Sequence, residues 1–122
     1  MQYRDRLNLF FAGQITGVEG YAGNIATGLI AAVNMSRYLH RKNLWTPPLT
    51  TMIGALCNYV SAADPAHFQP MKANFGILPP LENAVKNKQV RYSQYASRAI
   101  NDLEQSIQND QIIIVQESQI EV

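Results

Sequence analysis

Residues 9–21, LFFAGQITGVEGY, limit the possible folds of this chain more than any other segment. They begin as an apolar run without helical period, which is typical of a buried strand. Three glycines then break the pattern, and a long amphipathic helix follows. This order places the backbone N–H groups of a helix N-terminus beside a ligand, the usual arrangement for holding a phosphate or another anion. The pattern alone fits a tight structural turn equally well.

The spacing of apolar residues predicts three helices. The first covers about residues 21–41 and ends among cations, which suit a helix C-terminus. Thr50 or Thr51 caps the second, at about residues 50–62, and Asp64-Pro65 ends it. The third covers about residues 81–109. The expected buried stripe of the first helix is Ala22, Ile25, Ala26, Leu29, Ile30 and Val33, and that of the second is Met52, Ile53, Leu56, Cys57 and Val60.

The remaining segments are less regular. Residues 63–80 read as a long loop, which indicates a functional or a packed segment. The apolar side chains that could pack this loop down are Phe68, Met71, Phe75, Ile77 and Leu78. The predicted strand at residues 7–12 has no partner nearby in sequence, so we expect it to belong to a larger sheet whose other strands lie upstream. The alternative is a minimal two-stranded sheet with residues 112–115, a weak arrangement by itself.

The expected fold is therefore mostly α-helical with one or two short strands. Residues 1–42 would form a strand and helix of one domain, residues 43–109 a helical region with the long loop 63–80, and residues 110–122 a tail. The chain has 122 residues, enough for one domain, and its composition is globular. It contains no repeat of 20–50 residues.

Charge and cysteine content restrict the functional classes. The net charge is +1, so any surface for nucleic acid must be local. The single cysteine, Cys57, permits no internal disulfide, which favours a reducing compartment. It lies on an apolar helix face with no cation nearby, as expected of a buried structural residue. No run is long enough to span a membrane, and no secretory signal opens the sequence, so we expect a cytoplasmic protein.

Other motifs add little specific chemistry. The glycine spacing departs from the dinucleotide fingerprint G-x-G-x-x-G, and no P-loop is present. His40 and His67 lack ligands at metal spacing, so we expect no metal. Basic residues mix with Tyr38, Trp45, Tyr92 and Tyr95, a composition that suits RNA but also fits solvated helix faces. The basic residues are Arg37, Arg41 and Lys42 in one group, and Lys86, Lys88, Arg91 and Arg98 in another.

Two blocks carry a family resemblance. The first is LFFAGQITGVEGY, and the second comprises TTMIGAL at residues 50–56, ADP at 63–65 and FQPMKANFGILPPL at 68–81. Together they resemble the C-terminal part of the folate- and FAD-dependent tRNA (uracil-5-)-methyltransferase family, over roughly residues 2–107. The sibling flavoproteins that modify wobble uridine share AGQI and the later GY. Residues 23–25, here Gly-Asn-Ile, and Lys72 depart from the family's usual pattern.

The resemblance implies an activity and a set of sites. The family transfers a one-carbon unit from methylenetetrahydrofolate to the T-loop uridine of tRNA, using FAD reduced by NAD(P)H. It implies that the chain ends an α/β, Rossmann-like FAD-binding domain, adds a helical C-terminal region and contacts tRNA. It also implies that the catalytic residues and the dinucleotide fingerprint lie upstream. The residues implied to contact FAD are Gly13, Gln14, Ile15, Thr16, Gly17, Val18, Glu19, Gly20 and Tyr21.

Three hypotheses follow for the chain by itself. As a C-terminal segment of that enzyme, it would need the upstream FAD-binding domain and be inactive alone. As a standalone helical tRNA-binding or interaction module, it would bind RNA without catalysis. As a remnant without its sheet partners, it would be only marginally folded.

Overall fold

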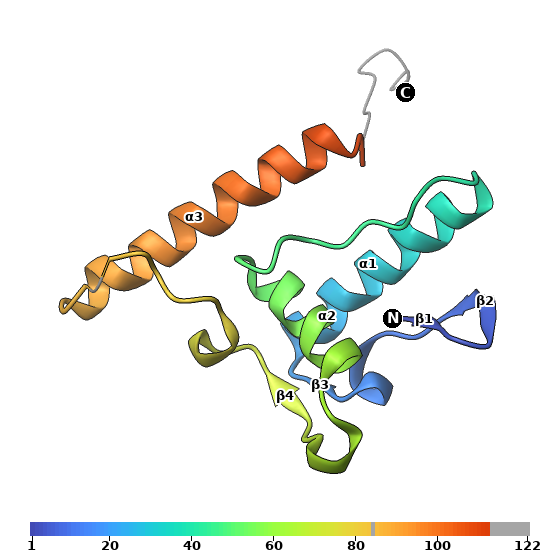
Figure 1. Ribbon diagram of the computed structural model, residues 1–122, viewed down its shortest axis with the longest axis horizontal. Helices are drawn as coiled ribbons and strands as arrows, with labels where there is room; N and C mark the ends of the chain where they lie inside the picture. Colours follow the sequence, from blue (N-terminus) through green and yellow to red (C-terminus); the bar gives the residue numbers. More distant parts are fainter. Residues whose placement is uncertain (84, 113–122) are drawn as a thin grey trace.

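The computed structural model describes residues 1–83 and 85–112. Its helices are α1 (Tyr21–Leu39), α2 (Met52–Ala62) and α3 (Lys88–Asn109). The short 3-10 turn η1 (Gly13–Thr16) precedes α1, and η2 (Pro65–His67) and η3 (Phe75–Ile77) lie between α2 and α3. Its strands are β1 (Gln2–Tyr3), β2 (Arg6–Phe10), β3 (Val18–Glu19) and β4 (Met71–Lys72). Figure 1 shows α1 and α2 at the centre, with the β1–β2 hairpin on one side and α3 on the other. The predicted mostly helical fold with short strands is confirmed.

The N-terminal strand is paired locally, so the expectation of a strand without a nearby partner was wrong. β2 pairs antiparallel with β1, with Gln2 opposite Phe10 and Tyr3 opposite Arg6. The polar N-terminal residues supply the partner, and the side chain of Gln2 donates a 2.7 Å hydrogen bond to the carbonyl of Leu7. Leu7 is 57% exposed, so β2 is not the buried strand that its composition suggested. The alternative partner, residues 112–115, lies outside the described residues except for Ile112.

Helix α1 forms where predicted, and its predicted stripe is only partly buried: Ile30 lies in the core and Val33 packs against it. Ile25 and Leu29, from the expected stripe, are 74% and 62% exposed. The buried positions are Gly23, Thr27, Ile30 and Asn34. Apart from Ile30, the residues of this face are small or polar, because the face lies very close to neighbouring residues and bonds to them. A Cβ atom on Gly23, for example, would lie 2.8 Å from the side chain of Val18. Hydrophobicity alone therefore identified the helix but placed its buried face only in part.

Helix α2 and the core follow the sequence more closely. The Thr51 hydroxyl accepts a 3.0 Å hydrogen bond from the N–H of Gly54, which confirms the predicted cap. Leu56 and Cys57 are buried as expected, and the buried cluster contains Ile30, Trp45 and Cys57. Partly buried side chains pack around this cluster: Met1, Val33, Ile53, Leu103, Ile107 and Ile112. The core therefore joins α1, α2 and the C-terminal half of α3.

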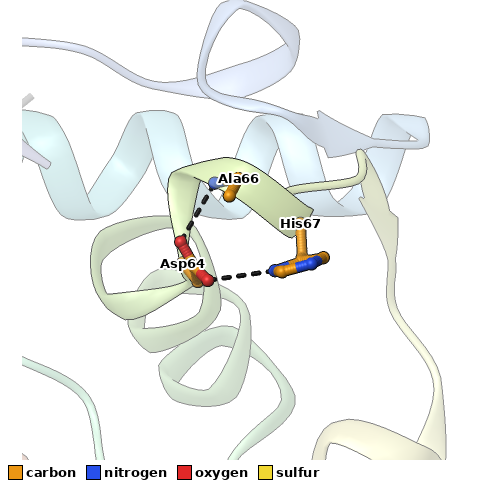
Figure 2. Close-up of polar contacts among 3 residues, drawn as sticks. All are labelled: Asp64, Ala66 and His67. Atoms are coloured by element: carbon orange, nitrogen blue, oxygen red, sulfur yellow. Dashed lines mark hydrogen bonds and ion pairs between the residues drawn. The ribbon is translucent and has the colours of Figure 1, made fainter.

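Asp64 ends α2 and starts the turn that follows it. Its carboxylate accepts hydrogen bonds from the N–H of Ala66 and from Nδ1 of His67, both 3.0 Å long (Figure 2). These two bonds hold the pKa of Asp64 below its usual range, and the bond from Ala66 has the larger effect. The predicted stop at Asp64-Pro65 is confirmed, since α2 ends at Ala62 and the turn η2 begins at Pro65.

The segment 63–80 is more regular than predicted. Its strand β4 pairs in parallel with β3, with Val18 opposite Met71 and Glu19 opposite Lys72. The N–H of Met71 also donates a 2.8 Å hydrogen bond to the carbonyl of Gly17. Local sequence could not reveal this pairing because the two strands are far apart in the chain. It holds the segment against the glycine turn.

Helix α3 begins later than predicted, at Lys88 instead of about residue 81. The Asn87 side chain accepts hydrogen bonds from the N–H groups of Gln89 and Val90 and so caps the helix. The C-terminal half of α3 is attached to the body: Nε1 of Trp45 donates to Ser106, and the Thr50 hydroxyl donates to Asp102. Within residues 1–83 and 85–112, no helix is long and apolar enough to cross a bilayer.

Candidate functional site

The glycine turn before α1 has a backbone that glycine accommodates best. Gly13, Gly17 and Gly20 have φ angles of +73°, +89° and +88°, a region that other residues rarely adopt. Gly17 is also required by space, because a Cβ atom there would lie 2.3 Å from the ring of Phe68. The turn therefore depends both on local conformation and on the segment 63–80 that covers it.

Thr27 fixes this turn to α1. Its buried hydroxyl accepts a 3.0 Å hydrogen bond from the N–H of Gly13 and donates to the carbonyl of Gly23 at 2.8 Å. At the same turn, the hydroxyl of Thr16 donates to the carbonyl of Gly13 at 2.6 Å. The position of the turn relative to the helix start is thus set by side chains of both elements.

Replacing Thr27 by valine should destabilise the chain while preserving side-chain volume. The buried N–H of Gly13 would lose its acceptor, at a cost of about 1–3 kcal/mol. Urea unfolding followed by circular dichroism measures this loss. The exposed Thr46, changed to valine, is the matched control and should leave stability within about 0.5 kcal/mol. Equal stability of the two variants would contradict the proposed role of Thr27.

A surface cavity of about 330 Å³ lies at the N-terminus of α1. The N-cap of α1, Gly20, has no side chain to accept from the first N–H groups of the helix. These donors and the positive end of the helix dipole are therefore available to an anion. The Oδ1 atom of Asn24 is buried and has no hydrogen-bond partner among residues 1–83 and 85–112. The lining residues are Gln14, Glu19, Gly20, Tyr21, Asn24 and Lys72.

The structure brings together only some of the residues expected to contact FAD. Gln14, Glu19, Gly20 and Tyr21 line the cavity. Gly13 and Val18 are buried and position the turn from beneath. Ile15, which is 79% exposed, and Thr16 line a separate depression beside the hairpin, and Gly17 lies under Phe68. Sequence reasoning missed Asn24 and Lys72 as lining residues; β4 brings Lys72 to the cavity by pairing with β3.

The basic residues form two separate groups. Arg37 donates to the carbonyls of Asn43 and Asp110, which places the group Arg37, Arg41 and Lys42 near the C-terminal end of α3. The second group, Lys86, Lys88 and Arg91, lies at the N-terminal end of α3. A 22-residue helix such as α3 is about 33 Å long. The two groups therefore cannot form one continuous patch.

The aromatic residues divide in the same way. Trp45 is only 6% exposed, and Tyr38 packs against Phe10 with ring centroids 6.3 Å apart. Trp45 is thus a core residue, unsuited to stacking on a base. Tyr92 and Tyr95 instead gather around Phe75, which sequence reasoning had assigned only to loop packing.

The cysteine and the histidines show no arrangement for catalysis or metal binding. Burial raises the pKa of the Cys57 thiol, as expected of a structural cysteine. Nδ1 of His40 contacts the carbonyl of Ser36, and His67 contacts Asp64. In the described part of the chain, no three His, Cys, Asp or Glu residues are placed to hold a metal ion.

Comparison with known proteins identifies the relatives of this chain. The family described as "Glucose inhibited division protein A" matches residues 1–43. Three proteins named methylenetetrahydrofolate–tRNA-(uracil-5-)-methyltransferase TrmFO match most of the chain. The protein from Halalkalibacterium halodurans is 51% identical over 108 residues, covering 88% of this chain and 24% of the relative. That from Syntrophomonas wolfei is 50% identical over 103 residues, covering 84% and 24%. That from Synechocystis sp. is 52% identical over 103 residues, covering 84% and 23%.

The chain spans about a quarter of the length of these relatives. Identity near one half over such a large share of the chain indicates common descent and a shared fold for the matched region. By sequence, the chain belongs to the TrmFO family and corresponds to about a quarter of the length of these members.

Proposed function

We propose that this chain serves the reaction of a FAD- and folate-dependent tRNA (uracil-5-)-methyltransferase. In that reaction a one-carbon unit passes from methylenetetrahydrofolate to carbon 5 of the T-loop uridine in tRNA, and FAD reduced by NAD(P)H supplies the electrons. The observation that carries the proposal is the identity of about one half to enzymes of that name over 84–88% of the chain. A tRNA substrate also favours a cytoplasmic location.

The start of α1 supports a contact with FAD. A pyrophosphate would accept from the N–H groups that Gly20 leaves uncapped, next to the cation of Lys72. The unpartnered oxygen of Asn24 can accept from a ligand donor, and the 91% exposed ring of Tyr21 offers apolar area. Glu19 adds one negative charge, and the register places it opposite Lys72. The cavity therefore fits a ligand with both anionic and polar groups.

The reaction needs more than the residues of this chain. The only cysteine is buried with a raised pKa, so it is a poor nucleophile. We propose that the catalytic groups and the rest of the FAD site lie in the part of the relatives that this chain does not match, and that the matched segment packs against that FAD-binding domain. The chain alone should therefore bind no stoichiometric FAD and transfer no methyl group.

A chimera tests this function directly. The aligned part of this chain, 88% of its length, would replace the matching quarter of the Halalkalibacterium halodurans enzyme, to which it is 51% identical. We expect the chimera to retain FAD through gel filtration and to methylate uridine in a tRNA transcript. A folded chimera that retains FAD but does not methylate would overturn the proposal.

A pair of charge reversals in the chimera tests the cavity. Lys72→Glu should reduce the FAD retained, because it places a second carboxylate beside the ligand anion. Lys42→Glu makes the same change in charge beyond the far end of α1 and should leave FAD retention unchanged. Equal loss of FAD in both would contradict the placement of the anion at the start of α1.

A further inference from the structure

We propose that the first half of α3 and the turn η3 bind an unpaired segment of the tRNA, through a surface that we call the α3 patch. This inference rests on the proposed function, and it selects one of the two basic groups as the one that contacts RNA. The α3 patch consists of Phe75, Lys86, Lys88, Arg91, Tyr92 and Tyr95. Figure 1 shows this end of α3 at the left, at the far side of the molecule from the C-terminal end of α1.

The aromatic rings of the α3 patch stack at the surface. Phe75 and Tyr92 are parallel within 1°, with ring centroids 4.2 Å apart, and Phe75 lies 5.5 Å from Tyr95. Phe75 is 41% and Tyr92 is 36% exposed. None of the residues of α3, Lys88–Asn109, is fully buried, so these rings are not part of a closed core. Exposed stacked rings offer unpaired bases a platform of the kind that single-stranded nucleic acids use.

Cations surround the same rings. Nζ of Lys88 lies 5.5 Å, and the guanidinium of Arg91 5.8 Å, from the centroid of Tyr92. Within residues 1–83 and 85–112 the only ion pair within 4.0 Å joins Asp64 and His67. The cations of the α3 patch therefore have no carboxylate partner there. Arg91 donates to the carbonyl of Val85 at 3.1 Å, whereas Lys86 and Lys88 are exposed and can pair with phosphates. Rings and cations together provide both parts of RNA recognition, stacking and backbone contact.

The order of charges along α3 opposes its helix dipole. Lys88, Arg91 and Arg98 occupy its first half, whereas Asp102 and Glu104 lie in its second half. A helix dipole favours the reverse order. A polyanion bound at the α3 patch would supply the missing compensation.

Arg98 acts as a positioning residue for the α3 patch. Its guanidinium donates to the carbonyls of Pro79 and Pro80, at 2.7 and 2.8 Å, and lies 5.1 Å from the centroid of Tyr95. These bonds attach the end of the segment that carries Phe75 to α3. They hold the two sides of the platform together, one from η3 and one from the helix.

The basic group at the end of α1 lacks these features. Arg37 is engaged with the carbonyls of Asn43 and Asp110, and the nearby Trp45 is buried. Arg41 and Lys42 are exposed cations, and in the described part of the chain the stacked rings, Phe75 and Tyr92, lie at the other end of α3. This group therefore provides the matched control.

The test measures binding of the full chain to an unmodified tRNA transcript by fluorescence anisotropy, over a series of salt concentrations. Lys86→Gln with Lys88→Gln should weaken binding and lower the slope of log affinity against log salt by about 1.4, since each single-strand phosphate contact contributes about 0.7. Arg41→Gln with Lys42→Gln removes the same charge and should leave the slope unchanged. Circular dichroism verifies that each variant is folded.

A ring substitution tests the stacking. Tyr92→Leu should weaken binding of a tRNA stem-loop by about 5-fold or more, with the salt slope retained. Tyr3→Leu, on the hairpin, is the control and should bind as the unchanged chain does. If only the variant Arg41→Gln with Lys42→Gln bound tRNA more weakly, the assignment of RNA binding to the α3 patch would be overturned and the proposed function would remain intact. Absence of tRNA binding by the unchanged chain at low salt and micromolar protein would also overturn it, whereas the chimera tests the enzymatic function independently.

Discussion

The Gly54→Ala variant is expected to lose more than about 3 kcal/mol of stability, and with it most of the folded population. The Cβ atom of alanine at this position would lie 2.1 Å from the carbonyl oxygen of Pro48 and 2.5 Å from that of Pro47. Both obstacles are backbone atoms of a proline segment, so neither can move as a flexible side chain would. The clash would separate the start of α2 from the segment that precedes it. Urea unfolding at equilibrium measures the loss.

Gly28→Ala is the matched control for this substitution. Gly28 lies inside α1, and a Cβ atom there would meet nothing within 4 Å. Alanine should therefore stabilise the chain by about 0.5–1 kcal/mol through its higher helix propensity. A Gly54→Ala variant as stable as the unchanged chain would contradict the close approach of α2 to Pro48.

The Asn34→Ala variant should lose roughly 2–4 kcal/mol of stability, because two buried backbone groups would lose their partners together. The Asn34 side chain donates to the carbonyl of Trp45 at 2.8 Å and accepts from its N–H at 2.7 Å. Both residues are buried, at 9% and 6% exposure. Trp45 is the only tryptophan, so its fluorescence during urea unfolding reports on the affected site itself.

Asn58→Ala provides the comparison for Asn34. Asn58 is an exposed residue of α2, and its substitution should change stability by no more than about 0.5 kcal/mol. Unfolding midpoints that shift equally in the two variants would show that Asn34 does not hold the segment before α2 in place.

Sequence reasoning succeeded where the determining interactions are local. Thr51 lies three residues before Gly54 and caps α2 by a bond within that span, and the glycines of the turn before α1 have the positive φ angles that a tight turn needs. It failed where a distant partner decides the outcome. The buried face of α1 is set by contacts of Thr27 with Gly13 and of Asn34 with Trp45, which hydrophobic periodicity does not register.

The candidate site follows the same division. The strand–turn–helix order and the family resemblance predict a site at the segment with Gly20 and Tyr21, and these two residues line the cavity. They did not identify Lys72 as a lining residue, because β4 reaches the cavity by a pairing that no local pattern predicts. Phe75 was likewise missed as a stacking residue, since its contact with Tyr92 crosses from a loop to a helix. The start of α3 was predicted too early, at about residue 81, because hydrophobic periodicity does not fix a helix start and the N-cap Asn87 was not identified.

The β3–β4 bridge also has a kinetic consequence. Val18 and Met71 are separated by 53 positions in the chain, and closing a loop of that length costs entropy before the bridge returns any stabilisation. Helices α1 and α2 lie within the loop and have local contacts of their own, so they should form first. The cavity at the start of α1 would then be completed late, when Lys72 arrives, and refolding followed through that cavity should lag behind refolding followed by helix content.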